Sequence, residues 1–97
     1  MIPMRPRYTP EAAALIRKFH PDVKRMIRAA IRRLLESPLS GHELRLELSG
    51  FRSYRAASYR IIYRYDEREN LLDVYYAGHR RNVYESLRDL LAGHRSE

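Results

Sequence analysis

A run of apolar residues at helical spacing between Pro21 and Ser37 most constrains what this chain can fold into. Apolar residues occupy every position that a helical period assigns to one face of this segment: Val23, Met26, Ile27, Ala30, Ile31, Leu34 and Leu35. The basic residues of this segment fall on its other faces, where we expect water to surround them. Ser37-Pro38 ends the run, because the residue before a proline resists the α-helical conformation. The sequence therefore predicts an amphipathic helix that packs on a core.

A shorter amphipathic helix is predicted directly before this one. Thr9 suits an N-cap, and Pro10 and Glu11 suit the first turn of a helix. Apolar residues follow at helical spacing to about His20, at Ala12, Leu15, Ile16 and Phe19. The two helices form a predicted αα-hairpin, which a short strand around Met4 to Tyr8 precedes.

Beyond Gly50 the apolar period changes to that of a β-strand. Apolar and aromatic residues recur at every second position at Tyr59, Ile61, Tyr63 and Tyr65. We expect this strand to pair antiparallel with one around Arg52 to Ala57. A third strand, from Leu71 to Ala77, follows a polar turn at Asp66 to Asn70. These segments predict a three-stranded antiparallel meander.

Two further segments complete the predicted fold. Leu39 to Gly50 carries loop signals, with three leucines as anchors at Leu44, Leu46 and Leu48. Val83, Leu87, Leu90 and Leu91 mark a C-terminal helix that ends at Gly93. At 97 residues the chain suits one domain. We therefore predict a single α+β domain over residues 1–97, in which an N-terminal strand and an α-hairpin pack on an antiparallel β-meander with a C-terminal helix.

The charge of the chain favours an anionic partner. Nineteen Lys and Arg against twelve Asp and Glu give a net charge of +7, and all the basic residues except Lys18 and Lys24 are arginine. Arginine has a planar fork that pairs with phosphate and stacks on nucleic-acid bases, which suits RNA. The same charge also suits an acidic protein partner.

The sequence also bears on where the protein acts. There is no cysteine, which suits a reducing compartment, and the N-terminal residues lack the apolar core of an export signal. No stretch of the sequence is apolar enough to span a membrane. We expect a cytoplasmic protein that is not embedded in a membrane.

The residues that could carry chemistry gather in the C-terminal half of the sequence. Phosphate-binding glycine loops and the motifs of serine hydrolases and zinc proteases are absent. The four histidines are scattered and have no cysteine near them, so we expect no metal site. The remaining candidates are Arg52, Arg55, Arg60, His79, Arg80, Arg81 and Tyr84.

Arg60 is the most informative of these candidates. It alternates with Tyr59 and Ile61, so it projects into the open face of the sheet if the tyrosine face packs on the helices. There it could form a salt bridge with Asp73 or a neighbouring acid, or it could bind a phosphate in a basic groove. Tyr54, Tyr75 and Tyr76 could stack on RNA bases, although packing on neighbouring strands is the better interpretation for at least two of them.

Several short motifs occur in an order that is found in one family. They are Leu48-Ser49-Gly50, Arg55, Tyr59-Arg60-Ile61-Ile62-Tyr63 and Gly78-His79-Arg80-Arg81-Asn82-Val83-Tyr84. With the helical hairpin before them and the closing helix after them, they resemble the RelE/ParE family of bacterial toxins. The resemblance extends over nearly the whole chain.

The resemblance implies a toxin of a type II toxin-antitoxin system that a cognate antitoxin keeps inactive. RelE-like members are ribonucleases that cut mRNA on the ribosome without a metal or another cofactor, whereas ParE-like members poison DNA gyrase. A non-toxic member that only binds its antitoxin, as a transcriptional co-repressor, is a third alternative. The RelE-like alternative is the function that we expect.

The resemblance also suggests roles for individual residues. Arg60 and Arg80 match the arginines that contact phosphate in the family, and Tyr84 matches its catalytic tyrosine. His79 could act as a second proton-transfer group, and the remaining arginines of the cluster, Arg52, Arg55 and Arg81, could bind RNA phosphates. Two of these assignments have structural alternatives, because Tyr84 lies at helical spacing from two leucines and His79 lies at a strand end.

The chain departs from the family pattern at two places. RelE-like nucleases usually carry lysines on the strand before the Tyr-Arg motif, where this chain has Arg52 and Arg55. Arginine holds its proton too tightly to act as a general base. Ser58 stands where glycine is common in the family. These differences favour phosphate binding over efficient catalysis.

Overall fold

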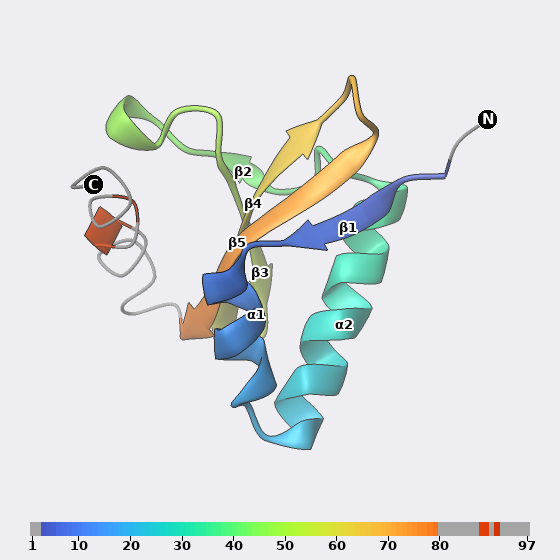
Figure 1. The fold of residues 1–97 in the computed structure, drawn as a ribbon, viewed down its shortest axis with the longest axis vertical. Coiled ribbons are helices and arrows are strands. Elements are labelled where there is room, and N and C mark those ends of the chain that lie inside the picture. The colour runs from blue at the N-terminus through green and yellow to red at the C-terminus, as the bar shows by residue number, and fades with distance from the viewer. Residues whose placement is uncertain (1–2, 80–87, 90, 92–97) are drawn as a thin grey trace.

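Two helices and five strands make up most of the computed structural model, which describes residues 3–79, 88, 89 and 91. The elements in chain order are β1 (Arg5–Tyr8), α1 (Pro10–Arg17), α2 (Pro21–Glu36), β2 (His42–Glu43), the 3-10 turn η1 (Leu46–Leu48), β3 (Arg52–Ala56), β4 (Tyr59–Asp66) and β5 (Leu71–His79) (Figure 1). The predicted order of strand, two helices and three strands is confirmed. The predicted C-terminal helix lies largely outside the described residues. The three residues of this segment that the structure describes, Arg88, Asp89 and Leu91, are helical.

The strands form one mixed sheet in the order β1-β5-β4-β3-β2. The meander of β3, β4 and β5 is antiparallel, as predicted, and β1 pairs parallel to β5. A β-bulge interrupts the register between β4 and β5 at Ile62 and Tyr63. The prediction of a loop between α2 and β3 was wrong at His42 and Glu43. These two residues form a short edge strand and pair with Ser53 and Arg52.

Local capping determines where the two helices begin. The Thr9 hydroxyl accepts a hydrogen bond from the Ala12 amide at 3.1 Å, as expected of an N-cap. The first helix ends at Arg17 and not near His20. His20 instead caps α2, because its Nδ1 accepts a hydrogen bond from the Asp22 amide at 3.1 Å. No helix in the described part of the chain is long and apolar enough to cross a membrane.

Apolar side chains cover the sheet on both faces. On one face the helices pack against the strands around a buried cluster of Ala12, Ile27, Ala30, Ile31, Leu34, Ala56, Ile61, Tyr63, Leu72, Val74 and Ala77. On the other face a smaller buried cluster contains Leu48, Phe51, Ile62 and Tyr76. Burial on both faces explains why Ile61, Ile62 and Tyr63 are consecutive apolar residues in an otherwise alternating strand.

Tyr63 ties the segment after α2 to the sheet. Its side chain is fully buried, and its hydroxyl donates a hydrogen bond to the Pro38 carbonyl at 2.6 Å. The same hydroxyl accepts a hydrogen bond from the Gly41 amide at 3.0 Å. A Cβ atom at Gly41 would lie 2.7 Å from the Tyr63 hydroxyl, so only glycine leaves room for this contact. The second tyrosine of the Tyr-Arg-x-x-Tyr motif is therefore structural.

The pH dependence of stability should reflect the desolvation of two tyrosines, the fully buried Tyr63 and the more exposed Tyr8. Burial raises the pKa of Tyr63 and of Tyr8 above the ordinary value of about 10. Because the unfolded chain then loses these protons first, their contribution to stability is complete below about pH 10 and falls as the pH rises further. We expect a spectrophotometric titration to find tyrosines that ionise at a higher pH than free tyrosine. The Tyr63→Phe variant should have one fewer of these late-ionising tyrosines. An unchanged number of late tyrosines in that variant would contradict this assignment.

Candidate nucleic-acid interface

Arg60 lies on the face of the sheet opposite α2. Leu15 of α1 and the helical Leu91 pack against the apolar cluster on that same face. The neighbours of Arg60 along β4, Tyr59 and Ile61, belong to or pack against the cluster beneath the helices, so the expected orientation of Arg60 is confirmed. Arg60 is paired with Arg55 on β3 and with Gly78 on β5. Paired residues of neighbouring strands share a face. We call the surface formed by Ser53, Arg55, Arg60, Tyr76 and Gly78 the Arg60 face.

The guanidinium of Arg60 makes one hydrogen bond within the described residues. Its Nη1 donates to the hydroxyl of Ser53 at 3.0 Å, and Ser53 is buried. The alternative of a salt bridge to Asp73 or a neighbouring acid is wrong for the described residues, where Arg60 forms no ion pair and Asp73 is paired with Arg7. The two distances of the Arg7–Asp73 pair are 2.6 Å and 3.1 Å, a bidentate arrangement.

Arg55 adds a second cation directly opposite Arg60. It is exposed, and its Nε donates to the carbonyl of Ala57 at 3.2 Å. No ion pair joins either arginine to a carboxylate within the described residues. Like charges at directly paired strand positions repel each other, so the pair gains when an anion binds between them. The Arg60 face is thus suited to a phosphate or a carboxylate.

Tyr76 and Gly78 form the β5 side of the Arg60 face. A Cβ atom at Gly78 would lie 2.5 Å from the Tyr76 hydroxyl and 2.7 Å from its ring, so the tyrosine side chain lies across Gly78. Tyr76 is only 7% exposed and packs with Phe51 and Ile62. The absence of a side chain at Gly78 therefore makes room for the Tyr76 ring.

Arg52 does not share a face with Arg60. It is paired with Tyr63, so it lies on the helix-facing side of the sheet. Its Nη1 donates to the carbonyls of Leu39 at 3.3 Å and Gly41 at 2.8 Å, and its Nη2 lies 3.3 Å from Glu43. These contacts hold the segment before β2, so Arg52 has a structural role.

His79 also lies on the helix-facing side. It is paired with Tyr59, and the two rings meet edge to face with centroids 5.8 Å apart. The Tyr59 ring in turn packs edge to face with the Phe19 ring, with 5.4 Å between the ring centroids. The structure therefore brings Arg55 to Arg60 but leaves His79 on the opposite face. Three other predicted site residues, Arg80, Arg81 and Tyr84, lie outside the described residues.

The tyrosines considered for stacking are engaged in packing. Tyr75 meets Phe51 edge to face at 4.8 Å between ring centroids. Tyr54 packs against the cluster beneath the helices, and its hydroxyl accepts a hydrogen bond from Arg33 at 3.3 Å. The preference for packing over stacking is confirmed for Tyr75 and Tyr76. In the described part of the chain, no His, Cys, Asp or Glu side chains gather into a group that could hold a metal ion.

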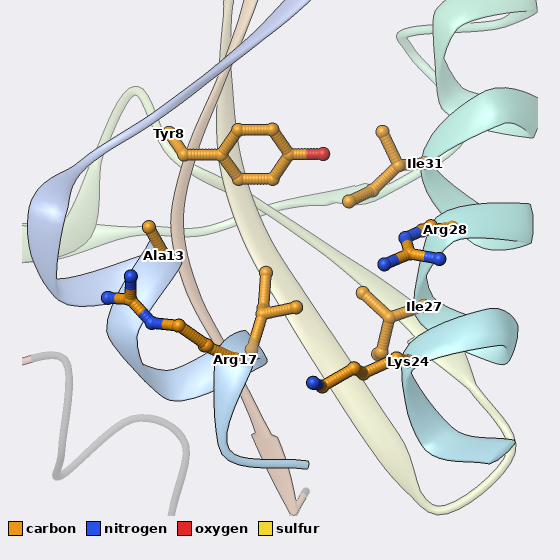
Figure 2. Close-up of a pocket in the computed structure, with 8 residues that line it drawn as sticks. Tyr8, Ala13, Arg17, Lys24, Ile27, Arg28 and Ile31 are labelled. Carbon is orange, nitrogen blue, oxygen red and sulfur yellow. The ribbon is translucent and has the colours of Figure 1, made fainter. Parts of the chain in front are cut away.

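A separate pocket lies on the helix side of the sheet. It has a volume of about 330 Å³ and is lined by Tyr8, Ala13, Ile16, Arg17, Lys24, Ile27, Arg28 and Ile31. Figure 2 shows Tyr8 pointing into the space between α1 and α2, with cationic side chains from both helices around it. The apolar walls and cationic rim suit an amphipathic, acidic surface, and the pocket is distinct from the Arg60 face.

Comparison with known proteins places the fold and the motifs in one group. Residues 7–88 match the family model described as the ParE-like toxin of type II bacterial toxin-antitoxin systems. A chain in the crystal structure of the toxin-antitoxin complex RelBE2 from Mycobacterium tuberculosis is 31% identical, with a TM-score of 0.73. The match covers 81% of this chain and 100% of that one. A search of curated proteins found no significant match.

More distant structures share the fold. The isolated RelE toxin of E. coli is 19% identical with a TM-score of 0.69, and the match covers 91% of this chain and 98% of that one. The YoeB/ParE toxin from Agrobacterium tumefaciens is 20% identical with a TM-score of 0.70, and the match covers 78% of this chain and 98% of that one. At these identities the likeness establishes the common α+β architecture of two helices on a five-stranded sheet.

Proposed function

The chain belongs to the ParE-like toxin family of type II bacterial toxin-antitoxin systems, and from this premise we propose that it is an endoribonuclease that cleaves mRNA on the ribosome. The observation that carries the proposal is Arg60, a cation on the face of the sheet opposite α2, with Arg55 paired to it and no carboxylate partner among the described residues. This is an arrangement that can receive a phosphodiester.

The proposed reaction needs no metal. The 2′-oxygen of a ribose attacks the adjacent phosphorus, the bond to the 5′-oxygen breaks, and a 2′,3′-cyclic phosphate remains. Negative charge grows on the phosphoryl oxygens during the attack, and guanidinium groups that are already in place stabilise it. A proton must leave the 2′-hydroxyl, and another must reach the departing 5′-oxygen.

We assign these tasks to residues of this chain as follows. Arg60 and Arg80 bind the reacting phosphate, Arg55 and Arg81 bind neighbouring phosphates, and Tyr84 gives the proton to the leaving oxygen. The proton of the 2′-hydroxyl passes to a water molecule. Arg52 and His79 were also candidates. Their positions on the helix-facing side argue against direct contact with the phosphate. We therefore assign Arg52 and His79 a structural role in the sheet and no contact with the RNA.

A second candidate function is inhibition of DNA gyrase. Two observations favour it: the matching family model is described as ParE-like, and the described part of the Arg60 face has no histidine or carboxylate to move a proton. A binding toxin needs no such group. In that alternative, Arg55 and Arg60 would contact an acidic protein surface.

We propose that a cognate antitoxin neutralises the toxin in the cytoplasm. One of the similar structures is itself a toxin-antitoxin complex. The net charge of +7 favours an acidic antitoxin segment. The pocket between α1 and α2, with Arg17, Lys24 and Arg28 at its edge, supports contact with an amphipathic segment of that kind.

Metabolic labelling during induced expression tests the proposed function. We expect incorporation of labelled methionine to stop within minutes, before incorporation of labelled thymidine falls, because translation is the primary target. Co-expression of the antitoxin should restore both. Early loss of thymidine incorporation together with a DNA-damage response would instead favour gyrase as the target.

A further inference from the structure

The hydroxyl of Ser53 lies behind the guanidinium of Arg60. Ser53 is 1% exposed, and tyrosines apart it is the one buried polar side chain in the described part of the chain. Its Oγ accepts a hydrogen bond from Arg60 Nη1 at 3.0 Å. Because a buried hydroxyl is costly without a partner, this bond stabilises one position of the arginine head group.

The position of Ser53 follows from strand geometry. It is paired with Ile62, which is fully buried, and it stands two pairs along from Arg55 and Arg60, on the same face of the sheet. The arginine side chain therefore reaches back diagonally across the strand pair to the serine. The other guanidinium nitrogens of Arg60 make no hydrogen bond to a described residue. They remain available to an anion at the surface.

We propose that Ser53 is a positioning residue that holds Arg60 in the orientation required to bind two oxygens of a phosphodiester. This inference rests on the proposed function and adds to it a residue that touches no substrate. A long arginine side chain in water samples many rotamers, and fixing it before the substrate arrives lowers the entropic cost of binding. The Ser53 hydroxyl supplies that restraint from within the sheet.

The alternative is that Ser53 only fills a small space between the strands. Two substitutions separate these roles. Ser53→Ala removes the hydroxyl, and Ser53→Cys keeps a side chain of similar shape but replaces a strong acceptor with a weak one. Ser58→Ala is the matched control, because Ser58 is exposed in the turn between β3 and β4.

The experiment combines three measurements on the full chain. The first is the amount of soluble toxin that arrests growth, and the second is the thermal midpoint. The third is nitrogen-15 relaxation of the Arg60 guanidinium. We expect both Ser53 variants to need about tenfold more protein for arrest, since a hydrogen bond to a charged group is lost. The thermal midpoint should stay within about 5 °C. Arg60 should become more mobile in both variants, and Ser58→Ala should match the parent.

Three results would overturn the inference. Wild-type potency of Ser53→Ala, with Arg60→Ala inactive, would show that the arginine acts without the serine and would leave the proposed function intact. A loss of potency in Ser53→Ala but not in Ser53→Cys would assign Ser53 to packing. Wild-type potency of Arg60→Ala would instead remove both the proposed site and the role of Ser53.

Discussion

Arg60→Ala is expected to abolish growth arrest while leaving the protein folded. If Arg60 binds the phosphate whose charge increases during cleavage, removal of its guanidinium should lower activity by a factor of about 10² to 10³, as for other preorganised donors. The fold should tolerate the change, because Arg60 is half-buried and makes one hydrogen bond, to Ser53, among the described residues. Growth after induction and circular dichroism measure the two effects.

Arg68→Ala is the matched control for this prediction. Arg68 is exposed in the turn between β4 and β5, and its removal changes the net charge by the same amount. If the effect depended on net charge alone, both variants would lose toxicity equally. Full toxicity of a folded Arg60→Ala protein would contradict the assignment of the Arg60 face as the functional site.

Gly41→Ala is expected to cause a large loss of stability. The new Cβ atom would lie 2.7 Å from the Tyr63 hydroxyl, 2.9 Å from its ring and 3.0 Å from the Ser53 carbonyl oxygen. Because Tyr63 is fully buried, it cannot move without disturbing the core and the two hydrogen bonds of its hydroxyl. We expect a loss of about 2 to 4 kcal/mol in the free energy of unfolding, measured by urea denaturation.

Combining Gly41→Ala with Tyr63→Phe tests whether the clash with the Tyr63 hydroxyl causes the loss of stability. Tyr63→Phe alone should cost about 1 to 3 kcal/mol, because it leaves the Pro38 carbonyl and the Gly41 amide without their partner. It also removes the atom that a Cβ at Gly41 would meet first. The double variant should therefore lose less than the sum of the single losses. Strict additivity would mean that the clash with the hydroxyl is not the main cost.

The helices and the meander could be predicted because each has a local pattern. The apolar period of α2 and the alternation of Tyr59, Ile61 and Tyr63 are properties of consecutive residues. The short strand β2 has no such pattern, because two residues cannot show a period. The parallel pairing of β1 with β5 joins segments that are distant in the sequence, so no local pattern predicts it.

The candidate site was predicted in part for a similar reason. Alternation along a strand puts Arg52 and Arg55 on opposite faces, so the sequence already contained the information that separates them. The same rule identifies Ser53 as a neighbour of Arg55 on one face. His79 is different, because its face relative to Arg60 depends on the register between β4 and β5 and on a bulge. Neither can be derived from local pattern.

The structure also separates two roles within the Tyr-Arg-x-x-Tyr motif. Tyr59 contacts Phe19 of the segment between the helices, and Tyr63 holds the segment after α2. Both tyrosines serve the packing of the sheet on the helices. Arg60 is the one residue of the motif with a charge, and it points to the other face. The motif thus couples the fold to the proposed function at a single strand.

Primer extension on a reporter mRNA in a translating extract tests the central claim most directly. With purified protein we expect new 3′ ends within the translated region, none on the same RNA when ribosomes are absent, and none with Arg60→Ala. The cut fragments should carry a 2′,3′-cyclic phosphate. Intact mRNA in the presence of folded protein that still arrests growth would contradict the claim and would point to gyrase as the target.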